Sequence, residues 1–240
     1  MIVLCTDFGP GPYTGQMQAV LAQQAPGVAV INLFDNLPCW DIQAAAYLLP
    51  AYVGEFPAES IFVCVVDPGV GSHAREPVIA RIDDRWYIGP GNGLFHILSR
   101  RAHATRFWRI DWQPEHLSAS FHGRDLFAPT AARLATGALP VGVPFTEPQP
   151  EGDWPDDLYR IIYIDHYGNA ISGMRAGLLE PTQKLKVGKH LLSRARTFSD
   201  VGEGEAFWYE NANGLVEIAV NRGRADDLAG LQLGSAIQLV

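Results

Sequence analysis

The sequence predicts an α/β N-terminal domain with a mainly parallel, Rossmann-like sheet, followed by a small all-β C-terminal domain, a barrel or a sandwich. Three observations lead to this prediction. Short apolar runs alternate with helix-like segments over the first half of the chain, which is typical of parallel sheets. A Pro-rich acidic linker at 146–157 ends that pattern, and strand-like segments joined by Gly-rich turns follow it. We therefore expect domains at 1–145 and 158–240.

The expected elements follow in chain order. In the first domain they are strands at 2–5, 28–33 and 61–66, helices at 13–24, 41–52 and 124–136, and a hairpin with strands 78–82 and 86–88. Asp41 can cap the second helix, because its carboxylate can accept an unpaired amide of the first turn. Asp83 and Asp84 mark the hairpin turn. In the second domain, strands are expected at 158–164, 184–187, 206–209, 215–220 and 236–240.

Composition restricts the class of protein. Among 240 residues, 48% are apolar and 18% charged, which indicates a folded globular chain. The net charge of -8 argues against a nucleic-acid partner, because phosphate binding needs clustered Lys and Arg. No apolar run is long enough to cross a membrane, and the N-terminus has no basic signal-peptide region, so we expect a soluble cytoplasmic protein. Cys5, Cys39 and Cys64 are scattered, so no metal site is expected.

The loop Asp67-Pro68-Gly69-Val70-Gly71-Ser72-His73-Ala74-Arg75 follows the apolar run 61–66 directly. Ligands of open α/β sheets bind outside the carboxyl ends of the strands, so Asp67 is expected at a site. The glycines allow backbone N–H groups to approach a ligand, and Arg75 can return a positive charge to Asp67. The alternative is an ordinary turn with a surface ion pair.

Two further polar clusters lie at expected element ends of the first domain. Asp7 follows the first strand in Thr6–Tyr13, where its carboxylate can accept both hydroxyls of a ribose or act as a helix-dipole carboxylate. His122 stands with Arg124 and Asp125 at a loop-to-helix junction. It is either a functional histidine or a hydrogen-bonded structural one.

The strand that opens the second domain ends in an acid, an aromatic ring and an amide: Asp165, Tyr167 and Asn169. Aromatic faces stack on bases, Asn can pair with a purine edge, and a carboxylate can hold an ammonium group. The alternative is a β-turn in which a Gly-Asn pair supplies positive φ. Similar polar turns at 208–214 and 217–223 predict nothing by themselves.

Seven motifs occur in order along nearly the whole chain: TDFG at 6–9, PYxG at 12–15, Trp-Asp at 40–41, VVDPGVG at 65–71, FHGRDxFAP at 121–129, IDxxGN at 164–169 and EIAVNxG at 217–223. In these motifs the chain resembles the S-adenosyl-L-methionine (SAM) hydroxide adenosyltransferases, or SAM hydrolases, relatives of the fluorinase and chlorinase. The resemblance implies hydrolysis of SAM at C5′ by an activated water, giving adenosine and L-methionine, with no cofactor.

The resemblance also implies roles for individual residues. Asp67, Arg75 and His122 match the family's catalytic residues; which of Asp67 and His122 takes the proton stays open. The implied substrate-binding residues are Asp7 at the ribose, Trp40 beside the sugar with Phe8 and Tyr13, Asp165 at the methionine ammonium, Tyr167, Asn169 and Phe198 at the adenine, and Asn211, Asn213 and Arg222 on turns that complete the pocket. A homotrimer is implied, with each substrate between the first domain of one subunit and the second domain of its neighbour.

The chain departs from the family at three places: the loop after Gly9 is one residue shorter, Gly91 stands where Asp is usual, and Val220 replaces an Arg found in the fluorinase.

Two functions are alternatives to SAM hydrolysis: a SAM-dependent halogenase and a non-catalytic adenosine or SAM binding protein. Halogenases have an uncharged replacement of the DPGVG region and an inserted loop, which this chain lacks, and Asp67 would repel a halide. The presence of Asp67 together with Arg75 and His122 disfavours a mere binding protein.

Overall fold

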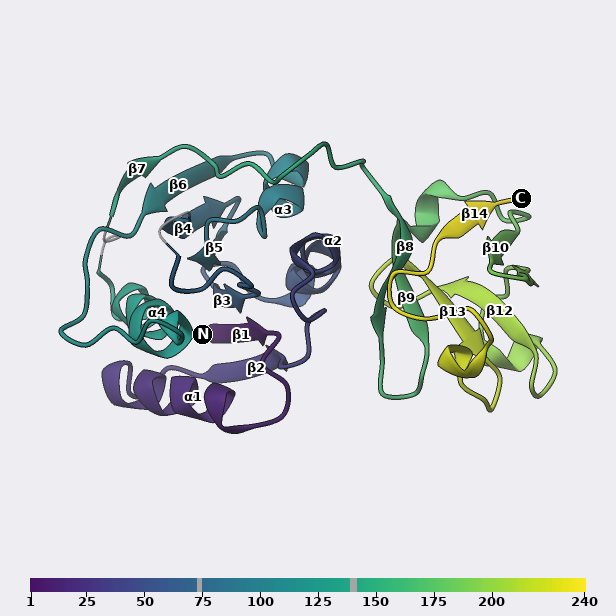
Figure 1. The fold of residues 1–240 in the computed structure, drawn as a ribbon, viewed down its shortest axis with the longest axis horizontal. Coiled ribbons are helices and arrows are strands. Elements are labelled where there is room, and N and C mark those ends of the chain that lie inside the picture. Colours follow the sequence, from purple (N-terminus) through teal and green to yellow (C-terminus); the bar gives the residue numbers. More distant parts are fainter. Residues whose placement is uncertain (73–74, 139–141) are drawn as a thin grey trace. The chain divides into compact units, whose positions relative to one another are not determined.

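The computed structural model describes residues 1–72, 75–138 and 142–240, so His73 and Ala74 of the loop expected after the third strand lie outside the described residues. The chain divides into two compact units (Figure 1). Unit 1 contains Met1–Ala46 and Gly54–Asp153, and unit 2 contains Tyr47–Val53 and Trp154–Val240.

Unit 1 is built on a seven-stranded sheet in the order β2-β1-β3-β5-β4-β6-β7. The strands are β1 (Ile2–Thr6), β2 (Val30–Phe34), β3 (Ile61–Val65), β4 (Pro77–Ile82), β5 (Arg85–Pro90), β6 (Thr105–Arg109) and β7 (Val143–Phe145). The pairs β1–β2, β1–β3 and β3–β5 are parallel. The pairs β4–β5, β4–β6 and β6–β7 are antiparallel. The predicted α/β class is confirmed, and the sheet is mixed, because three antiparallel pairings extend its parallel half.

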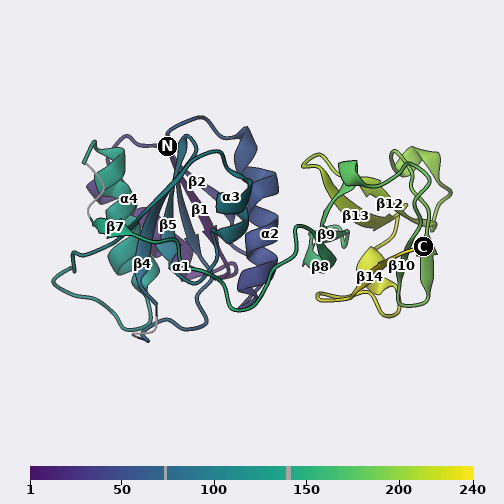
Figure 2. The same ribbon diagram turned by 90° about the horizontal axis from the view of Figure 1, so that it is seen from above.

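Helices cover both faces of this sheet. They are α1 (Pro12–Gln24), α2 (Ile42–Tyr52), α3 (His96–Arg101) and α4 (Ala128–Ala135), with a π-helical turn η2 (Gly123–Phe127) before α4 and a 3₁₀ turn η1 (Val53–Glu55) after α2. Helices α1 and α4 lie on one face, and α3 and the first turns of α2 lie on the other (Figure 2). On α1, Thr14, Met17 and Leu21 are buried at helical spacing, which explains why this helix docks on the sheet.

Local sequence signals explain the first elements well. Strands β1 and β3 are buried at every position, as their unbroken apolar runs predict. Asp41 caps α2 as expected, because Ala44 N donates to Asp41 Oδ1 at 2.9 Å. The hairpin at Asp83 is confirmed by the antiparallel pairing of β4 and β5, and Asp83 takes the positive φ of 50° that such a turn needs.

Other elements differ from the prediction. The helix expected at 124–136 begins as the π-helical turn, so its regular α-helical part starts only at Ala128. The elements α3, β6 and β7 were not predicted. Strand β6 carries arginines and is only partly buried, so its apolar signal is weak.

The Trp154–Val240 part of unit 2 is all-β, as predicted, and contains two antiparallel sheets. A four-stranded sheet has the order β12-β13-β9-β8 and a three-stranded sheet the order β11-β10-β14. The elements are β8 (Leu158–Ile164), β9 (Ala170–Arg175), η3 (Ala176–Leu178), β10 (Leu185–Val187), β11 (His190–Leu192), η4 (Phe198–Asp200), β12 (Ala206–Glu210), β13 (Leu215–Val220), η5 (Ala225–Asp227) and β14 (Ile237–Leu239). The core includes Ile161, Leu185, Trp208 and Ile218. Strands β9 and β11 were not predicted.

The segment 146–157 makes specific contacts. Ser99 Oγ of α3 donates to Glu147 Oε2 at 2.7 Å, and His96 Nδ1 lies 3.1 Å from Glu147 Oε1. Trp154 is buried. These contacts fix Glu147 to α3, and the boundary between the two compact units falls between Asp153 and Trp154.

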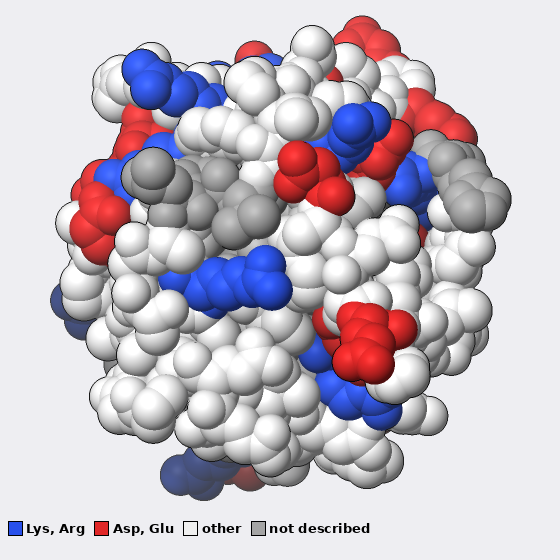
Figure 3. All heavy atoms as spheres, turned by 90° about the vertical axis from the view of Figure 1, so that its left-hand side faces the viewer, with Lys and Arg blue, Asp and Glu red and all other residues white. Residues whose placement is uncertain are grey.

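Charge on the surface is mixed. On the face of unit 1 that Figure 3 shows, basic side chains lie close to acidic ones among uncharged atoms. Within the described part of the chain, no helix combines the length and apolar character needed to cross a membrane.

Candidate active site

Two parallel strands bring Asp7 and Asp67 to the same edge of the sheet. Strands β1 and β3 pair with Thr6 opposite Val65, and each acid comes one or two residues beyond that pair. The backbone N of Asp7 donates to Val65 O at 3.3 Å. Because the carboxyl ends of parallel strands meet at one edge, residues 60 positions apart in the sequence face a common site.

A cavity of about 220 Å³ opens at this edge. It is lined by Asp7, Phe8, Trp40, Val65, Asp67, Val70, Ser120, Phe121, His122, Gly123 and Phe127. Five residues expected from the sequence therefore meet here: Asp7, Phe8, Trp40, Asp67 and His122. The expected Tyr13 packs beside them, with ring centroids 6.0 Å from Phe8 and 5.4 Å from Phe121.

Trp40 presents its ring to solvent at the rim of this cavity. The residue is 78% exposed and has a φ of 60°, which is uncommon outside glycine. Its backbone N donates to Asp7 Oδ2 at 3.2 Å. The strained backbone and the Asp7 contact hold an exposed aromatic face where it can pack on a ligand.

Asp67 is tied to its loop by two donors. Arg75 Nη1 and Gly69 N each lie 3.1 Å from Asp67 Oδ1, which confirms the ion pair expected between Asp67 and Arg75. The Asp67 side chain is only 9% exposed and that of Arg75 28%. A Cβ on Gly69 would lie 3.0 Å from Arg75 Cζ, so glycine lets the guanidinium lie across the loop.

His122 stands at the start of the π-helical turn, a local geometry that often marks functional sites. Gly123 packs under Met17 and Phe8, which fixes the turn against α1. The neighbouring Arg124 and Asp125 form an ion pair, with Nε 2.6 Å from Oδ1, and Ser118 N donates to Asp125. Arg124 and Asp125 therefore shape the turn that presents His122.

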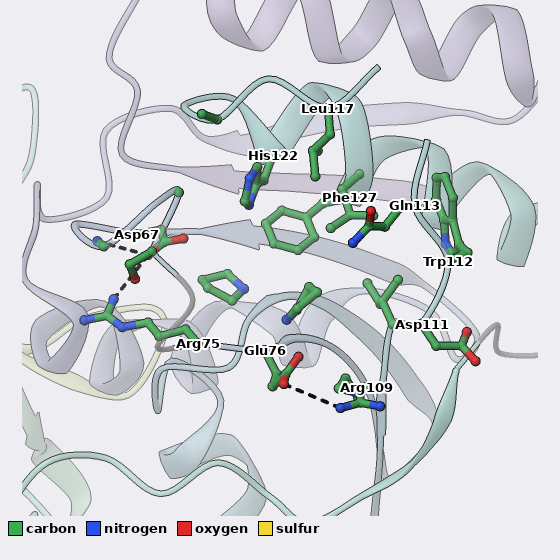
Figure 4. A pocket seen from close by; sticks show the side chains of 18 residues that line it. Asp67, Arg75, Glu76, Arg109, Asp111, Trp112, Gln113, Leu117, His122 and Phe127 are labelled. Atoms are coloured by element: carbon green, nitrogen blue, oxygen red, sulfur yellow. Dashed lines mark hydrogen bonds and ion pairs between the residues drawn. The ribbon is translucent and has the colours of Figure 1, made fainter. Parts of the chain in front are cut away.

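A second, larger cavity of about 610 Å³ shares Asp67, His122 and Phe127 with the smaller one. It is lined by Asp67, Gly69, Gly71, Ser72, Arg75, Glu76, Pro77, Pro90, Arg109, Ile110, Asp111, Trp112, Gln113, Leu117, Ala119, His122, Leu126 and Phe127. Figure 4 shows Asp67 and His122 facing this cavity, with Arg75 beside Asp67 and the Glu76–Arg109 ion pair, 3.5 Å long, further along it. Glu76 and Arg109 were not among the site residues expected from the sequence.

The environment of Asp7 in the site changes its pKa. Burial raises the pKa of Asp7, and the negative charge of Asp67 adds to this increase, while the hydrogen bond from Trp40 N opposes it. A nearby negative charge disfavours ionisation of a carboxyl group, so Asp7 is the acid of the site that is harder to ionise than usual.

In unit 2, Asp165 and Asn169 hold each other within one turn. Asn169 N donates to Asp165 Oδ1 at 2.8 Å, and Asn169 Nδ2 donates to Oδ2 at 3.0 Å. Gly168 takes a φ of 82°, and Ala225 N donates to its carbonyl, so the turn is anchored on η5. Tyr167 at the tip is 73% exposed, which leaves its ring free to pack on a ligand.

The remaining expected residues of unit 2 lie at both ends of β13. Arg222 follows β13 at the end where Ile218 pairs with Ala170, next to the Asp165 turn, and it pairs with Glu203 at 3.0 Å. Asn211 and Asn213 lie in the hairpin turn at the opposite end of β13, where Leu215 pairs with Arg175. Phe198 packs its ring on Phe207 and Tyr209, with centroids 5.3 and 5.5 Å away. The structure thus does not gather all seven expected residues of unit 2 in one turn.

Glu217 is a buried acid that the prediction missed. It is 5% exposed, and its carboxylate accepts hydrogen bonds from Asn211 Nδ2 at 3.0 Å and from the Tyr209 hydroxyl. Burial raises its pKa, and the nearby charge of Asp165 adds to the increase. A single acid inside the apolar run 215–220 was the signal that could have identified it.

Comparison with known proteins gives a consistent result. The family model described as the SAM hydroxide adenosyltransferase N-terminal domain matches residues 2–143, and that of the C-terminal domain matches residues 159–238. A protein of Thermus thermophilus named (R)-S-adenosyl-L-methionine hydrolase is 36% identical, with 100% of this chain and 99% of that protein covered. A protein of the same name from Salinispora tropica is 35% identical over 99% of this chain and 97% of its own length.

More distant relatives and solved structures complete the comparison. A fluorinase of an Actinoplanes species is 23% identical over 92% of this chain and 91% of its own length. A solved structure from Thermotoga maritima superimposes with a TM-score of 0.89 at 25% identity, and one from Thermus thermophilus with 0.77 at 34%; both cover 100% of this chain and 99% of their own. With both domain models matched in order and close relatives aligned from end to end, this chain belongs to the SAM hydroxide adenosyltransferase family.

Proposed function

We propose that this protein hydrolyses S-adenosyl-L-methionine at C5′, with water displacing L-methionine to give adenosine. One observation carries the proposal: Asp67, oriented by Arg75, faces the same cavity as His122, Asp7 and Trp40. The names of the relatives from Thermus and Salinispora support this choice of substrate.

The main catalytic requirement of this reaction is activation of the nucleophile, water. The leaving group is a sulfonium that becomes a neutral thioether, so positive charge disperses as the bond to carbon breaks. Water is a weak nucleophile and must be placed in line behind C5′, and positioning can contribute up to roughly 7 to 11 kcal/mol. Asp67 and His122 hold and polarise the water, and a positioned base adds about 10² to 10⁴ in rate. Arg75 fixes the Asp67 carboxylate.

The substrate-binding roles divide between the two units. Asp7 accepts hydrogen bonds from the ribose hydroxyls, and Trp40 packs beside the sugar. Asp165 binds the methionine ammonium, while Tyr167 and Asn169 bind the adenine. The smaller cavity of unit 1, which Asp7 and Trp40 line, is about 220 Å³, below the roughly 300 Å³ at which sites for drug-sized ligands begin, so a second set of groups is needed to enclose SAM. We place that set on a neighbouring subunit of a homotrimer.

The substrate is further narrowed by the names of the relatives, which specify the (R) form of SAM. We propose the (R) epimer at sulfur as the preferred substrate of this protein.

We also propose a cytoplasmic location. All three cysteines are free thiols, and Cys39 is exposed, which suits a reducing compartment.

A halogenase is the second candidate, because a fluorinase is among the relatives. The Asp67 carboxylate at the cavity disfavours it, since a desolvated halide would be repelled. To test both, the protein is incubated with (R)- and (S)-SAM, with and without chloride or fluoride, in ¹⁸O water, and the products are identified by mass spectrometry. Labelled adenosine, formed faster from the (R) epimer, is expected. A halogenated nucleoside or recovered substrate contradicts the proposal.

A further inference from the structure

The larger cavity has no role in the substrate contacts proposed above. Asp7 and Trp40 line only the smaller cavity, Arg75 lines only the larger one, and Asp67 and His122 line both. We infer that the larger cavity is the route by which water reaches C5′ and by which the proton released in the reaction leaves. This inference rests on the proposed hydrolase function.

The geometry of displacement requires such a route. The nucleophile must approach C5′ from the side opposite the departing sulfur. With the ribose at Asp7 and Trp40, the smaller cavity is filled by the substrate itself. Water can then reach C5′ through the wall that the two cavities share, and Asp67 and His122 are the polar members of that wall.

The lining of the larger cavity suits water. Glu76, Arg109, Asp111 and Gln113 offer charged and amide groups, and a buried water typically needs two to four polar partners. At about 30 Å³ for each molecule, 610 Å³ has room for on the order of 20 waters. The Glu76 and Arg109 side chains are 47% and 40% exposed, so this end of the cavity reaches bulk solvent.

The proton balance requires an exit as well. As the water oxygen bonds to C5′, the carbon–sulfur bond breaks and its electron pair goes to sulfur. One water proton stays on the new adenosine hydroxyl, and the other passes to Asp67 or His122. That residue must lose the proton before the next turnover. The larger cavity allows the loss while adenosine and methionine still cover the smaller one.

The inference is tested with a substitution that narrows the larger cavity and leaves the lining of the smaller one unchanged. Leu117 lines only the larger cavity and is 38% exposed, so Leu117→Trp fills space there at little cost to folding. We expect kcat to fall about tenfold or more, while KM for SAM and the Kd for adenosine stay within about twofold. The solvent deuterium isotope effect on kcat should increase, because loss of the proton becomes limiting. Leu233→Trp, at an exposed position of unit 2, is the matched control and should behave like the wild type.

Ala119→Leu narrows the same cavity at another exposed position. If Leu117→Trp does not fold, the same measurements on Ala119→Leu test the inference. A narrowed variant with wild-type kcat overturns the inference, as does a kcat loss accompanied by an equal loss of adenosine affinity. Failure of the wild-type protein to form adenosine contradicts the proposed function instead. The two failures are therefore distinguishable.

Discussion

Asp67 has one of its carboxylate oxygens, Oδ1, occupied by Arg75 and by the N–H of Gly69, each at 3.1 Å. The other oxygen, Oδ2, is thereby kept in a fixed orientation. A carboxylate held in this way can bind and polarise a water without first reorganising, which is what weak nucleophiles need.

Replacing this carboxylate with an amide should separate catalysis from binding. In Asp67→Asn the side-chain oxygen can still accept from Arg75, but the negative charge is lost. We expect kcat for SAM to fall by about 10² to 10⁴ while adenosine binding changes little. Steady-state kinetics and calorimetry with adenosine measure the two quantities. Turnover equal to that of the wild type would remove Asp67 from the mechanism.

Asp7 gives a pH-dependent prediction. Its pKa in the folded protein is raised, first by burial and then by Asp67, so the folded state holds this proton more tightly than the unfolded state does. The stability that Asp7 contributes is therefore greatest at low pH and decreases as pH rises from the usual value of about 3.9 through the raised pKa.

Asp7→Asn removes this titration and keeps an acceptor for Trp40 N. We expect its Tm at pH 7 to exceed that of the wild type by at most about 2–4 °C, the shift that 1 kcal/mol gives in a protein of this size. The difference should vanish near pH 3, and KM for SAM should rise because the amide has one acceptor oxygen instead of two, and Trp40 N uses that one. Thermal melts from pH 3 to 8 check the sign; a lower Tm for the variant at pH 7 would contradict this explanation.

At the scale of elements, the turn between β8 and β9 depends on one glycine. Gly168 has a φ of 82°, and a Cβ there would lie 2.4 Å from Asp226 Oδ1 and 2.9 Å from Arg224. The turn and the η5 segment therefore fit together only without a side chain at position 168.

Gly168→Ala should cost about 1–3 kcal/mol from the backbone strain, and the steric contact adds to this cost. Gly204→Ala is the control, since Gly204 has a similar φ of 77° with nothing within 4 Å of its would-be Cβ. Urea unfolding of both variants measures the difference. Equal destabilisation would show that the contact with Asp226 has no energetic importance.

Gly91, where the resemblance leads us to expect an aspartate, has no room for a side chain. A Cβ at this position would lie 2.5 Å from Glu76 O and 3.0 Å from Pro148 Cγ. An aspartate therefore does not fit between residues 76 and 148 as they are arranged here. The packing, which joins segments far apart in the sequence, is what favours glycine at this position.

The strength of the local signal separates the elements that were predicted from those that were not. Strands β1 and β3 are buried on both faces and are apolar throughout, so their sequences define them. In strand β6 two arginines flank one buried and one partly buried ring, and β7 has only three residues, two of them exposed. Strand β6 pairs with β4, and β7 pairs with β6. Both strands therefore depend on hydrogen bonds between segments that are distant in the sequence.

At the scale of the whole molecule, the proposed trimer gives a complementation test. Asp67→Asn inactivates the unit 1 half of a site, and Asp165→Ala weakens the unit 2 half. If each site combines halves from two subunits, random mixing of the two variants restores about a quarter of the sites. Activity after co-refolding or co-expression measures this, and light scattering gives the oligomeric state. A mixture no more active than its parts would place both halves of each site in a single chain.

By itself, the sequence determined the two-domain α/β and all-β classes, the seven motifs and the Asp67–Arg75 pair, because all of these depend on residues near one another in the chain. Tertiary structure alone decided that Asp7 lies beside Asp67, that two cavities share Asp67 and His122, and that Glu217 is buried under Tyr209 and Asn211. These relations arise from strand register and packing between distant segments, whose free energy is not contained in any one stretch of sequence.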